Sequence, residues 1–206
     1  MENLQIDMDI GGIITSLGVI ILGYFQYNQH AKNKLTDERI RLREAEDKAK
    51  RKQLKRAVND IVRELHRLLI KTDAQRAYIV QPHPLDKAKF ISIEYEVVSE
   101  GMTEIAQQVH RLPISSFSSF VTELSSRDFI LWKSQSDVKD GRARAIMHNI
   151  GTEKMAVCRM MDDDDVWLGN VVLDFDEHQT VEPVYLRDKM GEVANTIKYI
   201  LPEIEE

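Results

Sequence analysis

Residues 154–175 read KMAVCRMMDDDDVWLGNVVLDF, two apolar segments on either side of four consecutive aspartates. Apolar and β-branched residues dominate both segments, so we expect strands over 152–161 and 166–175. Asp162–Asp165 then form the turn of a hairpin. After Pro183, the apolar residues recur at helical spacing, which predicts a long amphipathic closing helix. Its inward face comprises Leu186, Met190, Val193, Ala194, Ile197 and Ile200.

The segment before this hairpin contains three more predicted strands and three short helices. Strands are expected over 75–81, 89–99 and 129–132, the second because apolar residues alternate with polar ones in FISIEYEVV. Helices are expected over 103–110, 115–125 and 137–149. The predicted fold class is therefore α+β, with a single antiparallel β-sheet flanked by helices over residues 54–206.

This order of elements resembles a GAF-type sensor domain, a relative of the PAS domains. The resemblance covers about residues 54–204 and rests on RAYIVQPH (76–83), SIEYEVVSEG (92–101), the 154–175 hairpin with Gly169, and the helix LRDKMGEVANTIKYIL (186–201). It implies a regulatory binding domain. The sequence has no NKFDE-like motif of the cyclic-nucleotide-binding members and no cysteine placed for a bilin. We therefore predict no cofactor, and the small-molecule ligand stays unnamed.

The N-terminal quarter of the chain has a different character. A short acidic N-terminus (1–9) precedes IGGIITSLGVIILGYFQY (10–27), which carries no charge and would be about 27 Å long as a helix. We predict a single transmembrane helix here; a buried core helix or a peripheral hydrophobic tail is the alternative. Basic residues follow it, so the positive-inside rule places the N-terminus outside the inner membrane and the C-terminal domain in the cytoplasm.

Residues 28–53 are predicted to form a charged helical stalk. Residues 30–76 contain 15 Lys and Arg against 8 Asp and Glu, a charge of +7, whereas residues 77–206 contain 13 against 23, a charge of −10. The acidic domain would repel nucleic acid, so the lipid bilayer is the expected partner of the basic segment. A seam of apolar residues follows the stalk and predicts either a homodimer or a helix that caps the following domain. The seam comprises Leu54, Val58, Ile61, Leu65 and Leu68.

The sequence contains no catalytic motif, which leads us to expect a non-enzymatic protein. Candidate ligand-binding residues are His83 between two prolines, His110 and Arg111 before Pro113, and the strand aromatics Tyr95 and Trp132. Tyr78, also on a predicted strand, is a further aromatic that could line a pocket or belong to the core. The four aspartates lack the alternating ligands of a calcium loop, so no metal site is predicted. Cys158 is expected to be a small core residue.

These features suggest three functions. The first is a membrane-anchored cytoplasmic sensory or regulatory binding module. The second is a holin-like or antiholin-like membrane effector of the kind that bacteriophages encode. The third is a structural tether for a protein partner.

Overall fold

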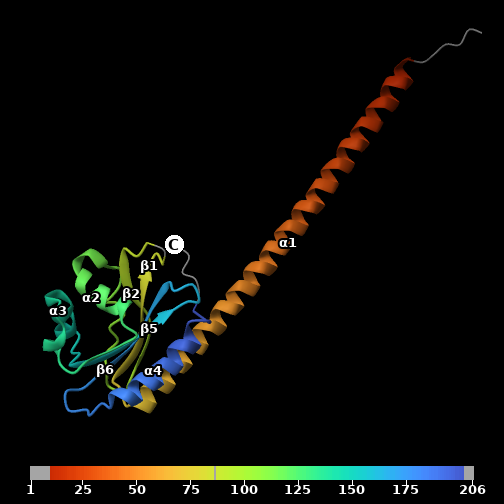
Figure 1. Ribbon diagram of the computed structural model, residues 1–206. Coiled ribbons are helices and arrows are strands. Elements are labelled where there is room, and N and C mark those ends of the chain that lie inside the picture. Colours follow the sequence, from red (N-terminus) through yellow and green to blue (C-terminus); the bar gives the residue numbers. More distant parts are fainter. Residues whose placement is uncertain (1–9, 86, 202–206) are drawn as a thin grey trace, which may run out of the picture. The chain divides into compact units, whose positions relative to one another are not determined.

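The computed structural model describes residues 10–85 and 87–201 (Figure 1). Side chains are described at residues 29, 32 and 34 and from 39 onward, so the predicted acidic N-terminus (1–9) and the side chains of the predicted span (10–27) lie outside the described part. Backbone contacts divide the chain into two units, Met1–Gln53 and Leu54–Glu206.

Helix α1 (Ile10–Thr72) belongs to both units. The stretch predicted as a stalk, 28–53, is helical throughout, as its lack of Pro and Gly indicates. Among the described residues, no helix is both long enough and apolar enough to span a membrane.

The second unit is built on one antiparallel sheet, as predicted; it has six strands, because the short strand β3 joins the five predicted ones. Its strands are β1 (Arg76–His83), β2 (Phe90–Val98), β3 (Leu112–Pro113), β4 (Phe129–Trp132), β5 (Lys154–Met161) and β6 (Trp167–Phe175). They lie in the order β3-β2-β1-β6-β5-β4. The hairpin β5–β6 thus packs beside β1, and β1 and β6 occupy the centre of the sheet.

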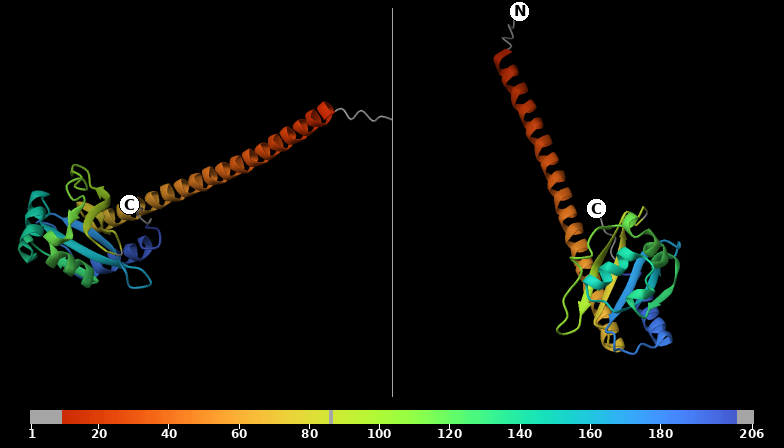
Figure 2. Two further views of the ribbon diagram at one scale, coloured as in Figure 1. Left: turned by 90° about the horizontal axis from the view of Figure 1, so that it is seen from above. Right: turned by 90° about the vertical axis from the view of Figure 1, so that its left-hand side faces the viewer.

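Helices cover both faces of this sheet (Figures 1 and 2). The closing helix α4 (Pro183–Ile197) and the last turns of α1 cover one face, which we call the helix face. The shorter α2 (Ser118–Ser126) and α3 (Gly141–Asn149) cover the other, which we call the cavity face. Two 3₁₀ turns, Ile114–Ser116 and Gln135–Asp137, precede α2 and α3 respectively.

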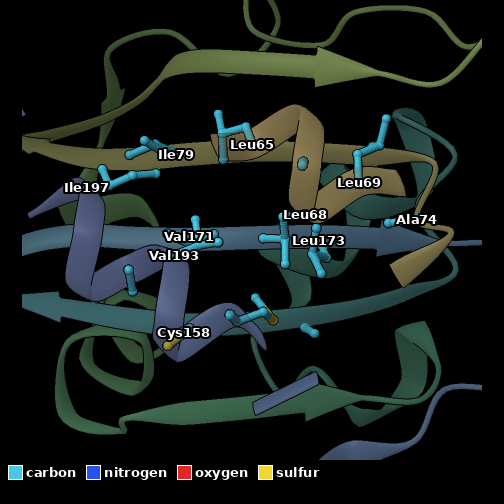
Figure 3. Packing of buried hydrophobic residues seen from close by; sticks show 14 of the residues in the cluster. Leu65, Leu68, Leu69, Ala74, Ile79, Cys158, Val171, Leu173, Val193 and Ile197 are labelled. Carbon is cyan, nitrogen blue, oxygen red and sulfur yellow. The ribbon is translucent and has the colours of Figure 1, made fainter. Parts of the chain in front are cut away.

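On the helix face, apolar side chains of α1 and α4 interdigitate with those of β1, β5 and β6 (Figure 3). Ile61, Leu65 and Leu68 are at most 1% exposed. Three residues of the predicted dimer seam therefore belong to the core of their own domain. This agrees with the prediction that the seam caps the following domain. Leu54 is 48% exposed, and pairing between two copies stays a prediction.

A glycine allows the two central strands to meet closely at one point. Gly169 has φ +138°, and a Cβ there would lie 2.3 Å from the carbonyl oxygen of Val80. The pairing of β1 with β2 shifts register between Ile79 and Val80, where Glu94 is the extra residue on β2. A side chain at position 169 would therefore force β1 and β6 apart.

The helix predicted over 103–110 is wrong, because this segment forms turns. The Glu96 carboxylate accepts hydrogen bonds from the backbone N–H groups of Ile105 and Ala106, and the Arg76 Nε donates to the carbonyl of Thr103. Inside a helix the Thr103 carbonyl would accept a bond from a residue one turn later, but here the Arg76 guanidinium occupies it. The helix predicted from Asp137 begins only at Gly141, where the Asp140 carboxylate caps the N–H groups of Arg142 and Ala143.

Candidate functional site: an apolar cavity on one face of the sheet

A cavity of about 60 Å³ lies between the sheet and the two short helices α2 and α3. β1, β2, β5 and β6 form its floor, and the segments around β3, α2 and α3 form its walls. Its lining consists of Tyr78, Val80, Ile91, Ile93, Val109, Leu112, Phe117, Phe120, Leu124, Ala143, Ile146, Met147, Ile150, Met155, Val157 and Val172.

The lining is aliphatic or aromatic apart from one hydroxyl group. That hydroxyl, on Tyr78, donates a 2.9 Å hydrogen bond to the carboxylate of Asp174. Burial, followed by the nearby Asp174 charge, raises the pKa of Tyr78 well above its ordinary value, so the phenol is neutral. An empty apolar space of 60 Å³ costs about 1.4 kcal/mol relative to a filled core, at about 24 cal/mol per Å³.

Three lining residues reach solvent, and they mark the mouth of the cavity. Leu112 on β3, Phe120 on α2 and Ile146 on α3 are each partly buried, whereas the other lining residues are buried. Phe120 stacks on Trp132 with ring centroids 5.3 Å apart. Residues from β3, α2 and α3 therefore form the mouth, and the one on α2, Phe120, stacks on Trp132.

A buried polar cluster closes one end of the cavity face. The Asp174 carboxylate accepts hydrogen bonds from Tyr78, from Thr152 (2.7 Å) and from the Arg76 guanidinium (3.2 Å). Burial raises the pKa of Asp174, against the lowering effect of these three donors. Arg76 also donates to the carbonyls of Thr103 and Ile150. The Arg76 guanidinium thus connects β6 to the segment around Thr103 and to the end of α3 at Ile150.

The five predicted ligand-binding residues lie elsewhere; none lines the cavity. His83 Nε2 lies 2.9 Å from a Glu94 carboxylate oxygen at the end of β1. Tyr95 packs against the core of the helix face. His110 is exposed.

Arg111 and Trp132 each contact an aromatic ring. Arg111 is exposed, has φ +50°, and holds its guanidinium 5.3 Å above the ring of Phe90, which does not line the cavity. Trp132 is 3% exposed and stacks on Phe120, which does. Of the two, Trp132 therefore supports a lining residue.

Of the cavity lining, the sequence analysis named only Tyr78 as a possible pocket residue. Tyr78 and Val80, Ile91 and Ile93, and Met155 and Val157 are alternate residues on their strands, a signal that marks one face of a sheet. Because both faces of this sheet are buried, alternation alone does not say which set faces a cavity. Ile146 and Met147 are adjacent on α3. Only the tertiary packing shows that Met147 is buried whereas Ile146 lies at the mouth.

The helix face has a wider and polar groove between β5 and α4, of about 350 Å³. Cys158 and Met160 lie at its base, and Arg159, Arg187 and Lys198 line its walls. Arg159 pairs with Asp128 at 2.5 Å, and Lys198 with Asp163 at 3.3 Å. Burial raises the pKa of the Cys158 thiol to about 11, so this cysteine is not a nucleophile at neutral pH.

Residues that could ligate a metal do not gather in the described part of the chain. No group of three or more His, Cys, Asp or Glu side chains is arranged around a common point there. Asp162, in the acidic turn, instead accepts hydrogen bonds from the backbone N–H groups of Asp164 and Val166.

Solved structures share this fold. The cyanobacteriochrome receptor PixJ superposes with a TM-score of 0.59 at 13% identity, over 72% of this chain and 97% of that one. The fold is that of a GAF domain. The blue-light absorbing PixJ GAF domain of Thermosynechococcus elongatus gives 0.57 at 10% identity, over 72% and 88% of the two chains. A phycoerythrobilin-bound GAF domain from a cyanobacterial phytochrome gives 0.52 at 14%, over 74% and 94%.

Identities this low establish the fold of the GAF-like domain and nothing finer. No family model matches the sequence, and no curated protein matches it. The chemistry of the site therefore has to come from the residues of this chain.

Proposed function

We propose that this protein is a membrane-anchored, non-catalytic regulatory module whose GAF-like domain binds a small molecule in the cavity under α2 and α3. The observation that carries the proposal is the cavity itself, closed on the floor by four strands and open at a three-residue mouth. Pre-formed apolar pockets of this kind are the usual binding sites of small ligands. The absence of a catalytic motif from the sequence supports a binding role.

The bilins of the structural neighbours do not fit this chain. A linear tetrapyrrole is several times larger than a 60 Å³ cavity. Cys158, the single cysteine of the sequence, faces the core on the opposite side of the sheet, so it offers no thiol for a covalent bond there. We therefore place no chromophore in the cavity.

Anchoring is proposed on the sequence of the N-terminal segment. Residues 10–27 carry no charge, and Lys32, Lys34 and Arg39 follow them. This order supports a single pass through the inner membrane with the GAF-like domain in the cytoplasm. Leu54 and the exposed apolar residues Ile40 and Leu42 support pairing of two copies along α1.

Native mass spectrometry of the full chain, released from detergent micelles, tests ligand binding and subunit number together. We expect an adduct of constant small mass and a dimer. The matched variants are Ala143→Leu, which fills the cavity, and Arg144→Leu, which adds the same side chain to an exposed site of α3. Loss of the adduct only in Ala143→Leu supports the proposal. A bare polypeptide mass in the unmodified chain contradicts ligand binding and favours a tether.

A further inference from the structure

We infer that the ligand of this cavity is a compact, uncharged, hydrocarbon-like molecule that fits a space of about 60 Å³. The inference rests on the proposed function and specifies its ligand class. Size, polarity and the mouth each contribute an argument.

Size sets the first limit. The cavity holds about 60 Å³. Nucleotides, tetrapyrroles and peptides exceed this space by a wide margin, and the floor cannot widen to admit them, because β1 and β6 are paired along five consecutive positions there. Enlargement has to come from the walls.

Polarity sets the second limit. Two buried side chains of the described part hold polar atoms without a hydrogen-bond partner, namely the amide of Gln81 and the Nε of Arg159. Neither residue lines the cavity. The Tyr78 hydroxyl donates its hydrogen to Asp174, which leaves only its oxygen as an acceptor for a ligand. A charged ligand, or one with several polar groups, would therefore lose its hydration without gaining enough partners, which strongly disfavours binding.

The walls explain how such a ligand enters and fits. Met147 on α3 and Met155 on β5 both line the cavity. Their unbranched thioether side chains can adapt to the shape of an apolar ligand. Entry requires movement of Ile146 or Leu112 at the mouth, whereas Phe120 is held by Trp132. The apolar guest would gain the dispersion contacts that the empty space lacks.

Methionine-methyl NMR of the full chain in phosphatidylcholine nanodiscs tests the inference, with dissolved xenon and benzene as probes. The resonances of Met147 and Met155 report on the cavity, while Met160 and Met190, buried on the helix face, serve as internal references. We expect saturable shifts of the first pair and no shift of the second. Ala143→Leu should weaken binding at least about tenfold, because its side chain takes up the same space, and Arg144→Leu should change it less than about twofold.

A second variant covers the case in which Ala143→Leu does not fold. Val157→Thr keeps the volume but adds a hydroxyl to the floor, and should weaken both probes about three- to tenfold. Equal shifts at all four methionines, or unchanged binding in both variants, would overturn the inference. If acetate or a cyclic nucleotide shifts Met147 and Met155 while xenon and benzene do not, the ligand class is wrong but the binding function stands. No response to any probe contradicts both.

Discussion

The two faces of the sheet are made by the same strands yet pack in different ways. On the helix face, α4 is 15 residues long and α1 is continuous, and their side chains fill the space against Ile79, Leu173 and Phe175. On the cavity face, α2 and α3 are only nine residues each and are joined by loops. The helix face leaves a polar groove beside β5 and α4, whereas the cavity face leaves an apolar space under its two short helices. The apolar space is therefore the one that suits an apolar ligand.

The largest expected effect concerns the polar cluster at the end of the cavity face. Arg76→Met leaves the Asp174 carboxylate buried without its cation, which should lower the free energy of unfolding by about 3–5 kcal/mol. Urea denaturation measures this. The control is Arg67→Met, which removes an exposed ion pair with Glu64 and should cost less than about 1 kcal/mol. Equal losses in both variants would show that the cluster is not essential to this face.

The helix face should be the more sensitive of the two to loss of a leucine side chain. Leu65→Ala removes a fully buried residue and should cost about 3–4 kcal/mol, within the range measured for buried leucines. Leu112→Ala, at the partly exposed mouth of the cavity, should cost about 1 kcal/mol, because it loses fewer contacts. Thermal or urea unfolding distinguishes them, and a reversed order would contradict the difference in packing.

The thiol of Cys158 reports on the tightness of the helix face. Its pKa of about 11, against an ordinary 9.0, predicts about hundredfold slower alkylation by iodoacetamide at pH 8 than in urea. Burial favours the neutral thiol over the thiolate. The stability that this preference contributes is fully present below the ordinary pKa and is lost as the pH rises through about 11. Rapid alkylation of the folded chain at pH 8 would mean that this face opens readily.

The smallest expected change in unfolding free energy comes from enlarging a buried alanine side chain. This substitution also gives the clearest contrast between the two faces. Ala143→Leu on the cavity face should change the unfolding free energy by less than about 1 kcal/mol, because the cavity accepts the new side chain. Ala156→Leu, at a fully buried position of the helix face, should cost about 1–3 kcal/mol through overpacking. Equal costs would indicate that both faces are filled.

The sequence predicted most of the scaffold. The hairpin β5–β6, the strands β1, β2 and β4 and the closing helix all follow from local patterns, because alternation, a turn of four aspartates and a Pro183 start are local signals. The helix predicted over 103–110 is absent for a physical reason: Arg76, which precedes Thr103 by 27 residues, holds the Thr103 carbonyl that the helix would need. Such bonds between remote residues leave no local pattern.

The candidate site was far less predictable. We looked for polar and aromatic residues, and His83, His110 and Arg111 are polar residues outside the cavity. The cavity arises from what short helices leave uncovered, which is a property of packing and not of any residue type. The apolar seam on α1 was likewise correctly read as buried at Ile61, Leu65 and Leu68, but the surface that buries them is the domain's own sheet.

A crystal structure of the protein under xenon pressure tests the central claim most directly. We predict a xenon atom between Met147, Met155 and Val172, with no ordered water in that cavity before pressurisation, because no buried side-chain N or O atom of the lining lacks a hydrogen-bond partner. Water molecules hydrogen-bonded within the cavity, or xenon bound only in the groove between β5 and α4, would contradict the account.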